Sequence, residues 1–511
     1  MRPRPMSEQP RTPAQPPAGG SSKQDPYEPV IGLEIHVQLA TRTKMFCGCE
    51  LSFGEPPNTR TCAVCLGLPG SLPVANAQAV HLGLVIGLAL GSELAPRSIF
   101  HRKNYFYPDL PKGYQISQYD EPLCRGGRLA DVRIHRVHLE EDAAKLIHEG
   151  ASGRIHGSDA SIVDFNRGGT PLAEIVTEPD LRTPEQASEW LKLLRTTLRQ
   201  LGVSDVNMEE GSLRCDANIS LRPAGTEELG VKTELKNMNS FRFIERGIRA
   251  EIARQRRILD GGGQVVQETL HFDPASEHIT SLRSKEEAHD YRYFPEPDLL
   301  PVAIDEHMLA AAQAAMSELP AERAVRFERE LGLSAESAQL LAFRAELGDY
   351  LEAALAAGAQ ASPQGEPPAP PQALANWIAG ELAVRLGAGE GADADPLNSR
   401  VTPAALAALV GMVAAKQVSV GAARQVLDTL VAEGGDPHVI VQAEGLAALD
   451  GGDELAAIVA AALEANADAA QRVREGNAKA IGPIVGHVMR ETRGRADGTE
   501  VARLVHEQLG T

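Results

Sequence analysis

The segment Val30–Leu39 (VIGLEIHVQL) constrains the fold more than any other stretch of this sequence. Its odd positions are apolar, whereas Glu34, His36 and Gln38 occupy even positions. This period of two predicts a half-buried β-strand, because successive side chains of a strand point to opposite faces. Glu34 and His36 are therefore expected on one face of the strand, about 7 Å apart.

Two further segments, Ser212–Arg222 and Val231–Asn237, alternate in the same way. Their polar positions are Arg214, Asp216 and Asn218 in the first segment and Lys232, Glu234 and Lys236 in the second. A sheet with one apolar and one ionisable face is typically antiparallel, with its polar face toward solvent or a cleft. We interpret this polar face as the floor of an active site. The alternative is an ordinary solvated surface, the usual role of charged residues on the outside of a sheet.

Length, charge and apolar runs limit the class of protein. A chain of 511 residues predicts several domains. A net charge of −19 argues against indiscriminate nucleic-acid binding, so an RNA partner would need local basic patches. The apolar run Leu82–Leu90 is far too short to cross a bilayer. Residues 1–26 lack the apolar core of a signal peptide and are rich in Pro, Gly and Ser, which predicts a disordered tail on a cytoplasmic protein.

Four of the six cysteines form two close pairs. Cys47 and Cys49 are separated by one residue, Cys62 and Cys65 by two, and twelve residues lie between the pairs. This spacing favours a tetrahedral zinc site with four cysteine ligands, which would be closed and structural. Reduced free thiols or a redox pair are the alternatives.

Acidic residues follow in two motifs, His138–Asp142 (HLEED) and Asp164–Val176 (DFNRGGTPLAEIV). Arg167 stands beside a Gly-Gly turn and can bind phosphate. Glu141 and Glu174 can bind a hard cation, and ligands of this kind favour Mg²⁺ or Mn²⁺ over zinc. The alternative is plain surface charge, as acidic triplets usually are.

Tyrosines and bases are interleaved in the segment His101–Tyr119, which holds half of the eight tyrosines beside Arg102, Lys103 and Lys112. Such a mixture can stack on and neutralise a nucleotide or the end of an RNA. A packing loop rich in tyrosine is an equal alternative. The sequence has no Gly-x-x-x-x-Gly-Lys-Ser/Thr motif, so ATP, if used, is not held by a P-loop.

The remainder of the chain is helical in pattern, which gives an α+β class overall. We expect a disordered tail (1–26), a catalytic cradle domain (27–302), a helical domain (303–394) with a Pro-rich insertion (359–371), and a helical tail domain (395–511). The tail ends in a local basic run of Arg490, Arg493 and Arg495. These arginines either contact RNA or merely oppose a helix dipole.

Seven motifs in order carry a resemblance to a known family. They are VIGLEIHVQL, RKNYFYPDLPKGYQISQYD, HLEEDAAK, DFNRGGTPLAEIV, MEEGSLRCDANISLR, KTELKNMNSF and DYRYFPEPDLLPV. Together they closely resemble the B subunits of bacterial aspartyl/glutamyl-tRNA(Asn/Gln) amidotransferases, the GatB/GatE family. The resemblance runs from about residue 28 to the C-terminus, where GNAKAIGPIVGHVM is similar to the family's tail domain.

The resemblance implies a kinase and transamidase that acts on misacylated tRNA. ATP phosphorylates the side-chain carboxylate of Glu-tRNA(Gln) or Asp-tRNA(Asn), and ammonia then displaces phosphate to leave the amide. It also implies a heterotrimer, in which an amidase-like A subunit makes ammonia from glutamine and a small C subunit wraps the other two. The cradle domain is expected to resemble the glutamine synthetase type of fold, and the helical tail to bind tRNA.

Site residues follow from the same resemblance. Mg²⁺ would be held by His36, Glu141 and Glu174, with Glu34 close by as a fourth catalytic residue. From the chemistry of phosphoryl transfer, and not from the resemblance, we expect Arg167, Arg214 and Lys236 to bind phosphate and Asp216 and Asn218 to orient substrate; Asn166, beside Arg167, is a further candidate for binding phosphate or substrate. Zn²⁺ would be held by the four paired cysteines. The runner-up function is an ATP-dependent ammonia ligase acting on a free amino acid, which would not need the helical tail; a non-catalytic tRNA-binding scaffold is a third.

Overall fold

A computed structural model describes most of the chain. The described residues are 25–52, 54–149, 160–236, 238–274, 276–284, 291–360, 368–387, 395–449, 453–492 and 494–511. The predicted disordered tail therefore lies outside the described residues except for its last two, and so does most of the predicted insertion 359–371. The chain divides into two compact units. Among the described residues, no helix combines the length and apolar character needed to cross a bilayer.

Unit 1 comprises the chain through Glu34 together with Thr177–Ser188 and Cys215–His289. Its strands follow the hydrogen-bonded order β15-β14-β13-β12-β1. Their bounds are Tyr27–Gln38 for β1, which continues into unit 2, Leu213–Pro223 for β12, Thr233–Lys236 for β13, Glu268–Asp273 for β14 and His278–Ser284 for β15. All three predicted alternating segments thus contain strands, and in β1 the half-buried Glu34, His36 and Gln38 alternate with buried apolar residues.

Helix α3 (Phe241–Asp260) begins where the Ser240 side chain accepts a hydrogen bond from the Phe243 amide. It packs on the strands through Gly247, where a Cβ would come within 2.9 Å of Leu235 in β13. This helix explains one departure from the predicted antiparallel sheet. β13 and β14 pair in parallel, because α3 carries the chain back to the same end before β14 begins. The pairs β12–β13 and β14–β15 are antiparallel as predicted.

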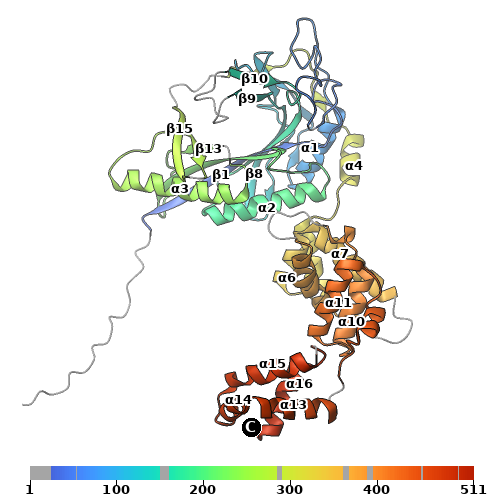
Figure 1. The fold of residues 1–511 in the computed structure, drawn as a ribbon. Helices are drawn as coiled ribbons and strands as arrows, with labels where there is room; N and C mark the ends of the chain where they lie inside the picture. The colour runs from blue at the N-terminus through green and yellow to red at the C-terminus, as the bar shows by residue number, and fades with distance from the viewer. Residues whose placement is uncertain are drawn as a thin grey trace, which may run out of the picture. The chain divides into compact units, whose positions relative to one another are not determined.

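Unit 2 comprises Ile35–Val176, Glu189–Arg214 and Asp290–Thr511. From the end of β1, its strands follow the order β11-β8-β6-β2, and β7 also pairs with β8. Their bounds are Pro171–Thr177 for β11, Val132–Glu141 for β8, Cys124–Arg125 for β6, Glu93–Leu94 for β2 and Arg128–Leu129 for β7. Helix α1 (Ala77–Ala89) lies beside β8 (Figure 1). Gly83 of this helix leaves room for the Leu139 side chain of β8. Helix α2 (Pro184–Gln200) begins in unit 1 and continues in unit 2.

Smaller sheets complete the β part of unit 2. A three-stranded antiparallel sheet has the order β16-β4-β5, and two-stranded pairs join β9 to β10 and β3 to β17. The bounds are Arg97–Ser98 for β3, His101–Asn104 for β4, Tyr114–Ser117 for β5, Lys145–Glu149 for β9, Ala160–Asp164 for β10, Phe294–Pro295 for β16 and Val302–Ala303 for β17.

The C-terminal part of unit 2 is helical, as the sequence predicts. The α-helices are Glu306–Ala314 (α4), Pro320–Leu331 (α5), Ala335–Ala342 (α6), Ala345–Gln360 (α7), Pro371–Asn376 (α8), Ala383–Arg385 (α9), Pro403–Ala414 (α10), Val420–Glu433 (α11), Pro437–Glu444 (α12), Asp453–Ala465 (α13), Ala467–Arg474 (α14), Gly482–Glu491 (α15) and Gly498–Leu509 (α16). A π-helix, Trp377–Leu382, and 3₁₀ turns at Pro396–Asn398 and Ala478–Ile481 join them.

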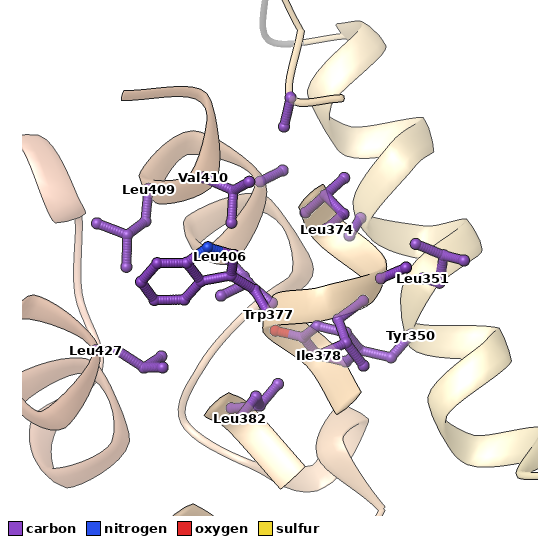
Figure 2. Packing of buried hydrophobic residues seen from close by; sticks show 14 of the residues in the cluster. Tyr350, Leu351, Leu374, Trp377, Ile378, Leu382, Leu406, Leu409, Val410 and Leu427 are labelled. Carbon is purple, nitrogen blue, oxygen red and sulfur yellow. The ribbon is translucent and has the colours of Figure 1, made fainter. Parts of the chain in front are cut away.

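Helix α4 packs against α1, and two separate hydrophobic cores hold the helices from α5 on. The first runs from Ala324 to Leu446, and Figure 2 shows Trp377 and its neighbours packed between the helices of this core. The second core runs from Leu455 to Leu509. The first core includes residues on both sides of position 394/395, where the sequence suggested a domain boundary.

Candidate active site

Three ionisable side chains from neighbouring strands of unit 2 converge on one point. They are His36 on β1, Glu140 on β8 and Glu174 on β11. His36 Nε2 lies 3.5 Å from Glu140 Oε1 and 3.6 Å from Glu174 Oε2. Both glutamates are buried, at 2% and 8% exposure, and His36 is half-buried. Because β11 lies between β1 and β8 in the hydrogen-bonded order, the three residues come from three adjacent strands.

His138 belongs to the same cluster and balances its charge. Its Nε2 lies 3.3 Å from Glu174 Oε2 and 3.8 Å from Glu140 Oε2. Burial opposes protonation of His138, but the negative charge of Glu174 and the hydrogen bond to Glu140 outweigh it and raise the pKa of His138 to about 9.

Both carboxyl groups of the cluster are held in the ionised form. Burial is the largest single influence and favours the neutral acid, but the nearby cationic groups, His138 foremost, together outweigh it and lower the pKa of Glu174 and of Glu140. Lys103 on β4 adds a second cation, since its charge lowers the pKa of each glutamate. Ionised, converging carboxylates can bind a hard cation.

Glu141, which the resemblance assigned to the metal site, lies on the other side of β8. Its carboxylate accepts hydrogen bonds from Lys112 Nζ and from the Ile116 amide, the latter at 2.9 Å. Glu140 takes its place in the cluster beside His36 and Glu174. The strand pattern of the sequence could have predicted that Glu140, and not Glu141, faces the cluster. Side chains alternate along a strand, so Glu141 lies on the same side as the apolar Val137 and Leu139.

The predicted phosphate-binding arginines Arg167 and Arg214 meet at Asp142. Arg214 Nη2 lies 3.1 Å and Arg167 Nε 3.5 Å from Asp142 Oδ2. Arg167 also donates to the carbonyls of Ala143 and Ala144, each at 3.0 Å. The acidic motif thus orients both guanidinium groups, and 40% of the Arg167 side chain stays exposed.

Asn166 makes contacts of a different kind from those the sequence suggested. Its Oδ1 accepts a hydrogen bond from the Arg60 amide at 2.8 Å, and its Nδ2 donates to the Pro56 carbonyl at 2.8 Å. The side chain therefore fastens the loop between the two cysteine pairs to the turn that carries Arg167.

The remaining predicted residues lie in unit 1. Asn218 Nδ2 donates to Glu34 Oε1 at 2.8 Å. Lys236 Nζ lies 2.9 Å from both Asp216 Oδ2 and Glu234 Oε1. Burial disfavours the charged amine, but these two carboxylates outweigh burial and raise the pKa of Lys236. The polar face of the strands is therefore a paired network of hydrogen bonds and ion pairs.

The four paired cysteines converge within unit 2. Their Sγ atoms all lie within 4.8 Å of one another, although Cys47 and Cys65 are 18 positions apart. A hydrogen bond from Cys47, opposed by burial and assisted by the Cys62 amide and by Lys44, lowers the pKa of Cys65 to about 4. Lys44 is buried, and its Nζ lies 3.6 Å from Cys65 Sγ and 3.0 Å from the Phe165 carbonyl.

Most of the chain matches one family of known proteins. The family description "GatB/GatE catalytic domain" matches residues 29–310, and "GatB domain" matches residues 359–509. Curated relatives are named as the B subunit of aspartyl/glutamyl-tRNA(Asn/Gln) amidotransferase. The relative from Frankia casuarinae is 48% identical over 95% of this chain and 96% of its own length. Those from Anaeromyxobacter sp. (strain K) and Thermobifida fusca are each 47% identical over 95% of this chain, covering 99% and 94% of their own lengths.

Proposed function

This chain belongs to the GatB/GatE family of amidotransferase B subunits, and from that premise we propose that it phosphorylates and amidates the side-chain carboxylate of Glu-tRNA(Gln), Asp-tRNA(Asn) or both. Transamidation of misacylated tRNA is the activity that the names of its relatives support. The observation that carries the proposal in this chain is the convergence of His36, Glu140 and Glu174.

The three residues fit a hard cation such as Mg²⁺. They offer two ionised carboxylates and one imidazole, with ligand atoms within 4.8 Å of one another, and no thiol takes part. We propose His36, Glu140 and Glu174 as the Mg²⁺ ligands. When bound, the ion would offset the charge of the anions that must approach one another during phosphoryl transfer.

The proposed reaction explains why cations lie around the Glu140 and Glu174 carboxylates. The side-chain carboxylate of the substrate is itself a poor acyl donor, because its leaving group would be oxide. Transfer of the γ-phosphoryl group of ATP to the carboxylate oxygen gives an acyl phosphate, and ammonia then adds to the carbonyl carbon while phosphate leaves. Lys103 and the Arg167–Arg214 pair are the cations we assign to the transferring phosphoryl group.

The unit 1 residues are assigned to orienting the substrate. Glu34 lies two positions before His36 on β1, and Asn218 holds its carboxylate. Asp216 and Lys236 form a neighbouring ion pair, and the Lys236 ammonium has a third donor beyond those toward Asp216 and Glu234. Glu141 and Asn166 are assigned to stabilising the structure around the site, not to contacting the reacting groups.

The cysteine cluster fits a structural Zn²⁺ ion. Four converging thiols, one of them with a strongly lowered pKa, match the all-cysteine ligand set of closed zinc sites. We propose that Cys47, Cys49, Cys62 and Cys65 hold Zn²⁺, which would fasten the loop that Asn166 joins to the Arg167 turn.

The helical part is assigned to tRNA binding and assembly. We propose that the tail domain, whose own hydrophobic core runs from Leu455 to Leu509, binds the tRNA body; the family match named "GatB domain" covers residues 359–509. We propose that an amidase-like A subunit supplies ammonia from glutamine and that a small C subunit completes a heterotrimer. The free amino-acid ligase is not favoured, because the relatives are named for action on tRNA.

Amide formation on misacylated tRNA tests the proposal. The chain is purified with its A and C partners and given ATP, Mg²⁺ and either glutamine or ammonium. Amide product that requires ATP, with ammonium able to replace glutamine, supports it, and separate assays of Glu-tRNA and Asp-tRNA define the substrate range. Amidation of free glutamate without tRNA would instead establish the ligase, and tight tRNA binding without ATP turnover would leave a scaffold.

A further inference from the structure

Three tyrosines form an aromatic wall beside the carboxylate cluster. The wall consists of Tyr119, which follows β5, and of Tyr291 and Tyr293, which precede β16. The rings of Tyr119 and Tyr293 are stacked, with centroids 4.4 Å apart and planes at 12°. Tyr291 meets Tyr293 edge-on at 6.2 Å. All three belong to unit 2, as do His36, Glu140 and Glu174.

Lys103 connects this wall to the carboxylates. Its Nζ lies 4.8 Å from the centroid of the Tyr291 ring. The same lysine interacts electrostatically with Glu140 and Glu174. The wall and the carboxylate cluster therefore share one lysine as a neighbour.

The wall keeps an open face. Tyr119 is 54% exposed although Tyr293 covers one side of its ring. A nearby pocket of about 180 Å³ is lined by Arg102, Lys112 and Tyr114, not by the three tyrosines. Sites for small ligands are usually concave and bury most of the ligand, whereas an open aromatic face is how proteins hold an unpaired base at the end of a strand.

We propose that Tyr119, backed by Tyr293, stacks on the terminal adenine of the misacylated tRNA. The inference rests on the proposed function, because the amino acid to be amidated is esterified to the ribose of that adenosine. Stacking the base would fix the ribose, and the ribose in turn would hold the side-chain carboxylate near the Glu140–Glu174 cluster. Tyr119 is then a substrate-positioning residue.

The test uses a tRNA whose terminal adenine is replaced by 2-aminopurine, which loses fluorescence when it stacks. The tRNA is bound to the complete complex, and Tyr119→Leu removes the ring while Tyr119→Phe retains it. Phe106→Leu is the control, because Phe106 is 86% exposed and lies outside the wall. Thermal unfolding checks that each variant folds like the wild type.

We expect quenching with the wild type, Tyr119→Phe and Phe106→Leu, and its loss with Tyr119→Leu. The KM for misacylated tRNA should rise about tenfold in Tyr119→Leu, with the KM for ATP unchanged. Quenching that persists in Tyr119→Leu, or a rise in the KM for ATP alone, would overturn the proposal. So would a wild-type complex that amidates its tRNA without any quenching, whereas a wild type that fails to amidate tRNA would reject the proposed function itself.

Discussion

Glu140 and Glu141 are neighbours in the sequence, yet their carboxylates serve opposite faces of β8. Glu140 lies 3.5 Å from His36 Nε2, whereas Glu141 accepts a hydrogen bond from the Ile116 amide at 2.9 Å and pairs with Lys112. The alternation of a β-strand separates one residue of the proposed metal site from one residue of the supporting structure.

The paired variants Glu140→Gln and Glu141→Gln follow from this relationship. Glu140→Gln should lower kcat roughly 100-fold or more and raise the Mg²⁺ concentration for half-maximal rate, because it removes a proposed ligand. Glu141→Gln should mainly destabilise, by about 3 kcal/mol, since it removes the buried anionic partner of the half-buried Lys112. Rates over a Mg²⁺ titration and unfolding in urea measure the two effects. The assignment is wrong if Glu141→Gln is the variant that alters the Mg²⁺ dependence.

Removal of zinc should mainly lower the stability of the protein. Replacing both Cys62 and Cys65 by Ser should abolish zinc binding and lower the unfolding temperature, because the folded loop would lose the proposed metal, whose binding free energy favours the folded state. Metal content by mass spectrometry and a thermal melt measure this. Cys124→Ala is the control, because Cys124 is buried outside the cluster and its loss should leave zinc in place. If purified wild-type protein contains no zinc even after zinc is supplied, the proposed zinc site is wrong.

The variants Asn166→Ala and Arg214→Ala should distinguish a structural role from a role in phosphate binding. Asn166→Ala removes the hydrogen bonds to Arg60 and Pro56 and should cost about 1–2 kcal/mol of stability, with little change in the KM for ATP. Arg214→Ala should instead lower kcat, because it removes a proposed phosphate contact. Kinetics with ATP varied, beside denaturant unfolding, distinguish the two; a raised KM for ATP in Asn166→Ala with normal stability would restore its predicted binding role.

The effect of a C-terminal truncation on folding should depend on where the chain is cut. Removing residues 453–511 deletes one complete core and should leave the rest folded, while the KM for misacylated tRNA rises sharply. Removing residues 395–511 also takes Val401, whose carbonyl accepts the hydrogen bond of the buried Tyr350 hydroxyl at 2.8 Å, and should unfold the helical domain. Circular dichroism and tRNA titration compare the two cuts. Equal loss of helical structure beyond the deleted residues would show that the cores are not independent.

The sequence alone was sufficient for the local structure and the family. Alternation in Val30–Leu39 predicted β1 with Glu34 and His36 half-buried, and the cysteine spacing predicted a cluster that the fold does assemble. The strand follows from the geometry of neighbouring residues, and the cysteine cluster from the short spacing within each pair, although contacts from Asn166 and Lys44 also hold the loop. The ordered motifs similarly indicated the GatB/GatE family that the comparisons show.

Only the tertiary structure decided which side chains meet. It joined Glu140 rather than Glu141 to His36 and Glu174, turned Asn166 toward the cysteine loop, paired β13 with β14 in parallel, and extended one helical core across position 394/395. Each of these depends on strand register, on the side of a crossover helix or on contacts between distant segments. These are set by packing over the whole fold, so local spacing in the sequence cannot determine them.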